Sequence, residues 1–318
     1  MNEKERHSRV ALRYALVAAA GIAALYGGTL ALCAPGVFAD GYDGIGFVQA
    51  VEKFDLAHFS PQPPGYPLYV LAARFLHACG LRPALALSTV SALLSAVGLG
   101  ALAGLLRVAA GRFAALLYLL LVPTAPLVYG LSMATLSDGA GLGCALLCTT
   151  LSLRALSRES GWSAHALVGV CAGAALGIRP PLLPLLLLAL GFFYGQALLR
   201  GEVSARAPLA LLGALAATVL SWLLPFACVI GPATLWKLSL AHAHGHLSDF
   251  GGTVLVETEL WPRLRDFGRG LLEGALGRFG WLLVLPALAG GLVAGGQSSA
   301  ARRVLLPCLI LFVGCTAW

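Results

Sequence analysis

Long apolar runs alternate along the chain with short polar connections. Most runs approach the ~20 residues that an α-helix needs to cross about 30 Å of hydrocarbon. None shows the ten-residue alternation of a transmembrane β-barrel. The pattern therefore predicts an all-α, polytopic membrane helical bundle that forms a single domain over residues 1–318. We expect about nine spans, at residues 12–33, 84–106, 113–131, 138–156, 164–178, 181–199, 208–230, 279–296 and 303–318.

One further apolar run, from Tyr66 to Cys79, is too short to be counted with the others on length alone. As a helix, its fourteen residues would rise only about 21 Å. Cytoplasmic loops carry an excess of Lys and Arg, which gives a second test. If the run does not cross, the N-terminus and every short inner connection are basic, with the pairs Arg107/Arg112, Arg154/Arg158, Arg200/Arg206 and Arg302/Arg303. If the run crosses, all four pairs move outside, so we expect a helix that lies on the outer surface.

The first outer loop, residues 34–83, thus contains two predicted interfacial helices. In the first, apolar residues recur at i, i+3, i+4 and i+7 from Phe47 to Phe54, opposite a polar face. The second is the run Tyr66 to Cys79. Between them, "HFSPQPPGYP" cannot form regular helix, because proline lacks an N–H and biases its predecessor to extended geometry. A second large outer loop is expected at residues 231–278.

Composition agrees with a membrane protein: 59% of residues are hydrophobic and 11% are charged, against about 25% charged in soluble domains. The net charge of +7 lies in the loops between spans, which does not favour nucleic acid as a partner. Most of the eight cysteines fall in or beside apolar runs. Cys144 and Cys148 share a helix face without His or carboxylate neighbours, so we expect packing and no metal there.

The N-terminal 33 residues combine a basic start with an apolar run of about twenty residues. This run is longer than the apolar core of a signal peptide, and we interpret it as a signal anchor. "VFAD" at residues 37–40 leaves open the alternative of a processed, secreted chain.

Most acidic residues fall on the outer side under this topology, whereas the spans carry few charges away from their ends. Each candidate has a structural alternative. Asp43 and Asp138 could serve as helix N-caps, and Arg179 could anchor at headgroup level. For "HAHGH", with His242, His244 and His246, three interpretations stay open: a zinc site in an extended strand, a polar or phosphate contact, and a solvated loop.

The order of motifs resembles the GT-C membrane glycosyltransferases, and it is most similar to bacterial protein O-mannosyltransferase-like members that use polyprenyl-phosphate sugars. The resemblance rests on "DGYDGIGFVQAV" after the first span, on "SPQPPGYPLYVL", and on a span that ends in "LLRVAAGRF". "SDGAG" and "RPPLLPLLLL" support it over roughly residues 10–200. The chain is shorter than most such proteins, which implies a short or truncated member.

The resemblance implies that an acidic residue soon after the first span is the essential carboxylate. Asp43 matches that position, and Asp40 is the second candidate. Asp43 would accept or orient the proton of an acceptor hydroxyl as the sugar leaves its lipid phosphate. The resemblance further implies ligand-binding roles for His58 and Gln62 before "PPGYP", for Asp138, and for Arg179 as a phosphate ligand. Arg74 is a further candidate at the rim of the site.

The resemblance therefore implies a glycosyltransferase of the bacterial inner membrane, with a cytoplasmic N-terminus and a periplasmic active site. Its partners would be a polyprenyl-phosphate sugar donor, a lipid, glycan or protein hydroxyl acceptor, and membrane lipids. No organic cofactor is implied, and a divalent metal is compatible with the motifs. Two alternatives are a lipid-linked sugar flippase, which predicts broken helices and internal repeats, and a non-catalytic protein that retains the fold.

Overall fold

The computed structural model describes residues 3–34, 39, 41–156, 160–248, 265 and 268–269. Within these residues every named element is a helix, and the extended backbone pairs only in an isolated bridge between Asp55 and Ser60. The elements are α1 (Glu3–Cys33), α2 (Gly41–Glu52), η2 (Leu56–His58), α3 (Pro67–Ala78), α4 (Pro83–Ala109), α5 (Gly111–Leu121), α6 (Pro126–Met133), α7 (Asp138–Leu156), α8 (Trp162–Ile178), η3 (Pro180–Leu182), α9 (Leu183–Leu199), α10 (Arg206–Ile230) and α11 (Pro232–Ser248).

Five of the described helices are long and apolar enough to cross a membrane: α1, α4, α7, α10, and α9 together with η3. The bent pair α5 and α6 adds a sixth if it is taken as one span, and α8 is a shorter apolar helix of 17 residues. The architecture is that of an integral-membrane helical bundle, as predicted. The predicted spans at 279–296 and 303–318 lie outside the described residues.

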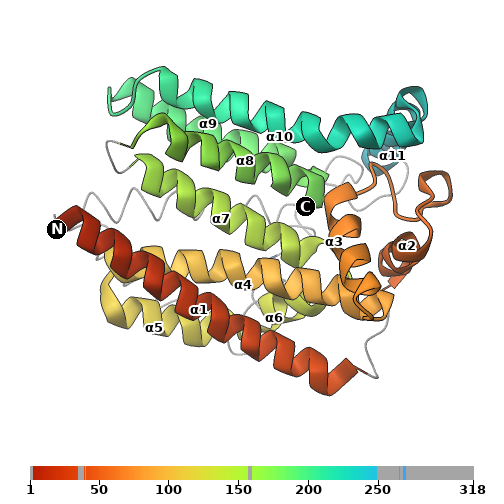
Figure 1. Cartoon of the computed structure of the whole chain (residues 1–318), viewed down its shortest axis with the longest axis horizontal. Helices are drawn as coiled ribbons and strands as arrows, with labels where there is room; N and C mark the ends of the chain where they lie inside the picture. The colour runs from red at the N-terminus through yellow and green to blue at the C-terminus, as the bar shows by residue number, and fades with distance from the viewer. Residues whose placement is uncertain are drawn as a thin grey trace.

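The long helices run back and forth, so that the bundle has two different ends (Figure 1). The N-terminus lies at one of them, which we call the basic end because it carries Arg6, Arg9, Arg107, Arg112, Arg154, Arg200 and Arg206. At this end the Arg154 guanidinium donates to the Ser8 hydroxyl over 3.2 Å. The other end, which we call the loop end, carries α2, α3 and α11 (Figure 1). The described basic pairs therefore share one end, as the charge pattern predicted.

Small residues allow the central helices to approach closely. A Cβ added at Gly98 of α4 would collide with the backbone of Gly143 in α7. Gly100 of α4 has no room for a Cβ beside Ala19 of α1, and Gly169 of α8 has none beside the backbone of α10. Without a hydrophobic drive between helices in lipid, such contacts supply dispersion energy through close backbone approach.

The prediction of one continuous span at 113–131 is wrong, because the helix is broken into α5 and α6. Helices α5 and α6 meet at an angle of 64°. Pro123 and Pro126 cannot donate backbone hydrogen bonds, and each disfavours helical geometry in its predecessor. The Tyr26 hydroxyl of α1 donates to the freed Pro123 carbonyl oxygen over 2.8 Å. Such compensation by a neighbouring helix allows a break to persist inside a bundle.

The first outer loop contains the two predicted short helices, α2 and α3. Helix α3 begins with Pro67 at its first turn, where a missing N–H costs nothing. It packs against α4, α2 and the end of α8, and it is not among the described helices that could span a membrane. The prediction that this apolar run does not cross the membrane is consistent with the position of α3 at one end of the bundle (Figure 1).

The start of the second predicted outer loop, residues 231–278, is helical. After Gly231, which has a φ of 90°, Pro232 opens α11, which continues to Ser248. "HAHGH" therefore lies in a helix, and the expectation of an extended strand or open loop there is wrong. Most of the remainder of 231–278 lies outside the described residues.

Candidate functional site

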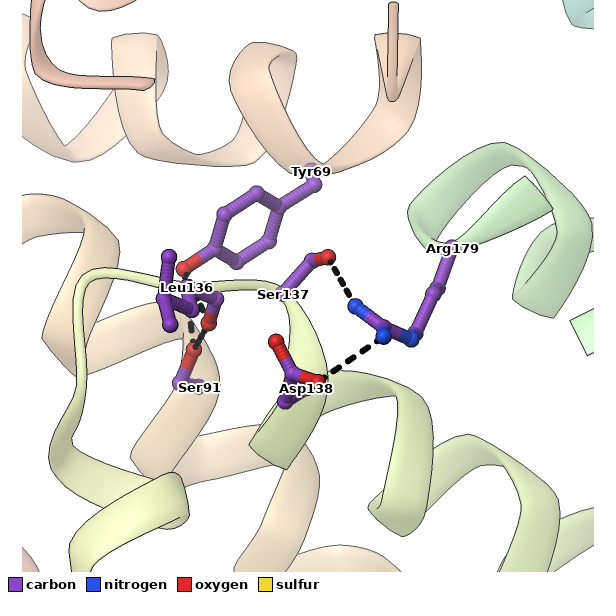
Figure 2. A network of polar contacts seen from close by, with 6 residues as sticks. All are labelled: Tyr69, Ser91, Leu136, Ser137, Asp138 and Arg179. Atoms are coloured by element: carbon purple, nitrogen blue, oxygen red, sulfur yellow. Dashed lines mark hydrogen bonds and ion pairs between the residues drawn. The ribbon is translucent and has the colours of Figure 1, made fainter. Parts of the chain in front are cut away.

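Asp138 and Arg179 meet at the loop end of the bundle. Asp138 is the first residue of α7, and Arg179 directly follows α8. The guanidinium Nη2 lies 2.8 Å from the Asp138 Oδ1, and Nη1 donates to the Ser137 hydroxyl over 3.0 Å (Figure 2). The two charged side chains are 23% and 33% exposed, respectively. The structure thus brings together two predicted ligand-binding residues that are 41 positions apart in the sequence.

Local sequence explains how Arg179 reaches this position. Pro180 and Pro181 end α8, which leaves Arg179 in an extended conformation with φ −143° and ψ 89°. Its side chain crosses α7 at Gly141, where an added Cβ would collide with the Arg179 Cδ. Asp138 lies in the first turn of α7, where a negative charge also favours the helix dipole. The ion pair of Asp138 is therefore combined with a favourable position for its charge at the start of α7.

A second polar network fixes α3 to the start of α7. The Tyr69 hydroxyl lies 2.9 Å from both the Leu136 carbonyl oxygen and the Ser91 hydroxyl, and Ser91 donates to the same carbonyl over 2.8 Å (Figure 2). Tyr69 and Ser91 are fully buried. Since a buried carbonyl without a donor costs about 1–3 kcal/mol, this network holds the segment before Asp138 in place.

Asp43 lies in the first turn of α2 and is exposed to solvent. Its charge acts on Tyr66, as do the charges of Arg179 and Asp138. Burial is the main reason why the pKa of Tyr66 rises to about 12; Arg179 lowers this pKa and the two carboxylates raise it. Asp43, Asp138 and Arg179 therefore lie at the same end of the bundle as Tyr66. Asp40, the second candidate for the essential carboxylate, lies outside the described residues.

The segment between α2 and α3 is a compact corner. Asp55 and Ser60 exchange backbone hydrogen bonds of 2.6 and 2.9 Å, and the peptide bonds before Pro61 and Pro64 are cis. The His58 Nδ1 lies 2.8 Å from the Asp55 Oδ2, and this hydrogen bond lowers the pKa of Asp55. The His58 side chain is 81% exposed.

Gln62 is the buried counterpart of His58 in this corner, with an exposed fraction of 9%. The corner packs against α2 at Gly46, where an added Cβ would lie 2.5 Å from the Phe59 carbonyl oxygen and 3.8 Å from the Gln62 Oε1. Asp43 lies one helical turn before Gly46, on the same side of α2. Gln62 and Asp43 therefore belong to the same part of the loop end.

Arg74 connects the two short helices. Its Nε lies 3.2 Å from the carbonyl oxygen of Ala50 and 3.1 Å from that of Val51, in the last turn of α2. A cation at a helix C-terminus satisfies free carbonyls and complements the helix dipole. The Nε of this predicted rim residue is therefore engaged in holding α2 against α3.

The three histidines of "HAHGH" all belong to α11. The His242 ring packs edge-on against Phe59, with centroids 6.0 Å apart, and His244 is exposed. His246 follows in the same helix. Over the described part of the chain, no group of three or more His, Cys, Asp or Glu side chains could hold a metal ion. The described residues therefore provide no built zinc or magnesium site, although α11 does contact the corner through Phe59.

An apolar groove of about 430 Å³ opens where α8 ends and α9 begins, with α10 on its other side. The Trp222 indole N–H donates to the Gly173 carbonyl oxygen over 3.0 Å, so it is satisfied within the protein. The groove suits a hydrocarbon chain. Its lining residues are Leu176, Pro180, Leu183, Leu215, Ala216, Val219, Leu220 and Trp222.

Sequence reasoning missed four polar residues of this region: Tyr66, Tyr69, Ser91 and Ser137. Both tyrosines lie in the motif "PPGYPLYVL", where a phenol inside an apolar stretch signals a buried hydrogen bond or a binding group. The two serines carry no comparable signal, because small polar residues are common in membrane helices that pack closely.

Together these groups supply carboxylates as acceptors, a guanidinium and a phenol as donors, and an adjacent apolar groove. Such a set can bind and orient a polar group that carries a hydrocarbon tail. Comparison of the chain with protein-family models, with curated proteins and with solved structures finds no match. The function must therefore be argued from the site itself.

Proposed function

We propose that the protein is a GT-C-type glycosyltransferase that moves a sugar from a polyprenyl-phosphate carrier to a hydroxyl acceptor. One observation carries the proposal: Arg179 pairs with Asp138 at the end of the bundle that α2 and α3 cover, and Asp43 lies in the first turn of α2 at that same end. The motif resemblance assigned roles to these three residues from sequence alone. Their gathering at one end is what a shared active site requires.

In the proposed reaction the bond between the sugar anomeric carbon and the phosphate oxygen breaks, and a bond to the acceptor oxygen forms. The exposed Asp43 carboxylate takes the proton of the acceptor hydroxyl. Arg179 has five N–H donors, of which the Ser137 and Asp138 contacts use two. The remaining donors are available to the lipid phosphate, whose charge increases as the sugar leaves. Attack from the opposite side would invert the anomeric centre.

The apolar groove supports a lipid-linked donor. Pro180 lines the groove and directly follows Arg179, so a hydrocarbon site begins beside the proposed phosphate ligand. A donor with a phosphate and an isoprenoid tail matches this arrangement, in which Arg179 would bind the phosphate and the groove would bind the tail. Holding donor and acceptor at one interface would supply much of the rate through orientation.

The proposed orientation places the basic end in the cytoplasm and the loop end in the periplasm of a bacterial inner membrane. Arginines at the basic end support it through the positive-inside rule. Lipid, glycan and protein hydroxyls are all candidate acceptors. A divalent metal remains compatible with the motifs, and no step of the proposed reaction depends on one.

The test is Asp43→Asn in purified protein supplied with a labelled polyprenyl-phosphate sugar. We expect transfer to fall at least about 100-fold, because a general base contributes 10²- to 10⁴-fold. The matched control is Glu52→Gln, another exposed acid of the same helix, which should retain transfer. Undiminished transfer with both Asp43 and Asp40 changed to Asn would refute the assignment of the base.

A flippase for lipid-linked sugars is the second candidate, and the broken helix pair α5–α6 favours it. Transporters build substrate sites at discontinuous helices, and Tyr26 already supplies a buried polar contact at this break. Movement of the labelled lipid across liposomes without transfer to any acceptor would select this candidate. Donor binding with neither transfer nor movement would instead indicate a non-catalytic protein.

A further inference from the structure

Tyr66 has an unusual backbone conformation for a large side chain. It precedes α3 with φ 49° and ψ 52°, in the left-handed region. Bulky residues rarely adopt this conformation, and outliers of this kind cluster at binding and active sites. Packing keeps it there: the Phe47 ring meets the Tyr66 ring edge-on with centroids 5.0 Å apart. The left-handed backbone and the contact with Phe47 together fix the position of the Tyr66 side chain.

The Tyr66 side chain is 6% exposed, yet none of the described residues makes a hydrogen bond with its hydroxyl. Tyr69, one turn later, is also buried and also packs against Phe47, but its hydroxyl is hydrogen-bonded to Leu136 and Ser91. Because buried hydroxyls are normally paired, an open one points to an external partner.

Three charged residues from three different parts of the chain act on this phenol: Asp43 from α2, Asp138 from α7, and Arg179 after α8. Burial raises the pKa of Tyr66 to about 12, so the phenol keeps its proton and remains a neutral donor. With two carboxylates and one guanidinium, the charged groups sum to −1. A site of this charge with an added neutral donor suits a polyhydroxyl group better than a second anion.

We propose that Tyr66 is a sugar-binding residue, whose hydroxyl donates a hydrogen bond to an oxygen of the sugar on the lipid carrier. This inference rests on the proposed function and specifies its donor site. The lipid phosphate takes the free N–H groups of Arg179, and the sugar hydroxyls donate to the carboxylates while Tyr66 donates to the sugar. Tyr66 thereby distinguishes a glycosylated carrier from the bare lipid phosphate.

The experiment compares Tyr66→Phe with the unchanged protein, both as full chains in lipid nanodiscs. The probes are polyprenyl-phosphate mannose, polyprenyl-phosphate glucose, and the same polyprenyl phosphate without sugar. We expect Tyr66→Phe to weaken binding of at least one glycosylated probe by about fivefold to tenfold, the loss of one neutral hydrogen bond. Binding of the bare phosphate should change less than about twofold. Tyr42→Phe, which removes a hydroxyl from a 76% exposed side chain at the same end, should change neither.

The outcomes separate the two hypotheses. If the unchanged protein binds no glycosylated probe, the proposed function fails and the inference fails with it. If it binds them and Tyr66→Phe binds them equally well, only the inference fails. Equal weakening for bare and glycosylated probes would assign Tyr66 to the phosphate, which also overturns it. An unchanged thermal midpoint for Tyr66→Phe shows that weaker binding does not result from unfolding.

Discussion

The arginines at the two ends of the bundle differ in how they are held. At the basic end, Arg112, Arg200 and Arg206 are exposed at or beside helix ends. At the loop end, Arg179 lies across α7 with only 23% of its side chain exposed and pairs with Asp138. Arg154 at the basic end also has a partner, the Ser8 hydroxyl, but Arg179 is held by Ser137, by a carboxylate and by the close approach of Gly141.

This difference shows that arginines with different tasks are built differently. An exposed arginine at a membrane surface needs only its charge to orient the helices, and its contribution to folding is small. Arg179 is partly desolvated, so its position requires specific partners. The burial and the partners of an arginine therefore distinguish one that orients the helices from one suited to binding. Amino-acid composition does not make this distinction.

The largest expected effect tests whether the two ends face opposite sides of a membrane. Two variants each carry a single cysteine, either Cys79, which is exposed at the loop end, or a cysteine introduced by Arg112→Cys at the basic end. In intact cells of a bacterial host stripped of the outer membrane, a membrane-impermeant maleimide should label Cys79 and leave the other unlabelled. Permeabilised cells should show both labelled. Labelling of the basic end alone from outside would invert the proposed orientation.

A smaller effect measures how strongly the loop-end arginine is coupled to its partner. A double-mutant cycle of Arg179→Ala and Asp138→Ala should give a coupling of about 1–2 kcal/mol in the free energy of unfolding, since the pair is partly buried. Reversible denaturation in mixed micelles provides the measurement.

The matched control for this cycle is Arg200→Ala at the basic end, which should change the free energy of unfolding by less than about 0.5 kcal/mol. A coupling energy near zero between Arg179 and Asp138 would contradict the contrast between the two ends. So would a loss of unfolding free energy for Arg200→Ala as large as that for Arg179→Ala.

The smallest expected effect concerns the exposed pair Asp55 and His58 in the corner. The hydrogen bond from His58 lowers the pKa of Asp55 below its ordinary value of 3.8. The stabilisation from this hydrogen bond is therefore fully present above pH 3.8, and it is lost as the pH falls through the lower pKa that Asp55 has in the folded protein. His58→Ala should return the pKa of Asp55 toward 3.8, as measured by carbon NMR of labelled aspartate. The control His77→Ala, which removes a contact to the Leu81 carbonyl oxygen, should leave the pKa of Asp55 unchanged.

Much of the fold could be predicted because membrane helices follow from length and apolarity. Residues 138–156 coincide with α7, and the predicted spans 84–106 and 208–230 fall within α4 and α10. The break between α5 and α6 was missed although both of its prolines are visible, because the whole of 113–131 is apolar. Whether a proline kinks or breaks a span depends on what satisfies the freed carbonyl, and here that is Tyr26 from another helix.

The site was predictable only in part. Asp138 and Arg179 were singled out from their places at the ends of spans, and the structure pairs them. Arg74 was predicted at the rim of the site, and its contact with the last turn of α2 was not foreseen, because that contact depends on how α2 and α3 pack. Two of the three interpretations of "HAHGH" placed it in a strand or a loop, but it lies in α11.

The sequence by itself determined the helical membrane architecture, the separation of basic from acidic ends, and the stiff proline corner. These are properties of composition and local stereochemistry, which need no distant partner. Only the tertiary structure decided that Asp138 meets Arg179, that the Tyr69 hydroxyl is hydrogen-bonded within the described residues while that of Tyr66 is not, and that an apolar groove forms between the end of α8 and α10. Each of these depends on helix packing across tens of residues, where glycines such as Gly141 set the distance between backbones.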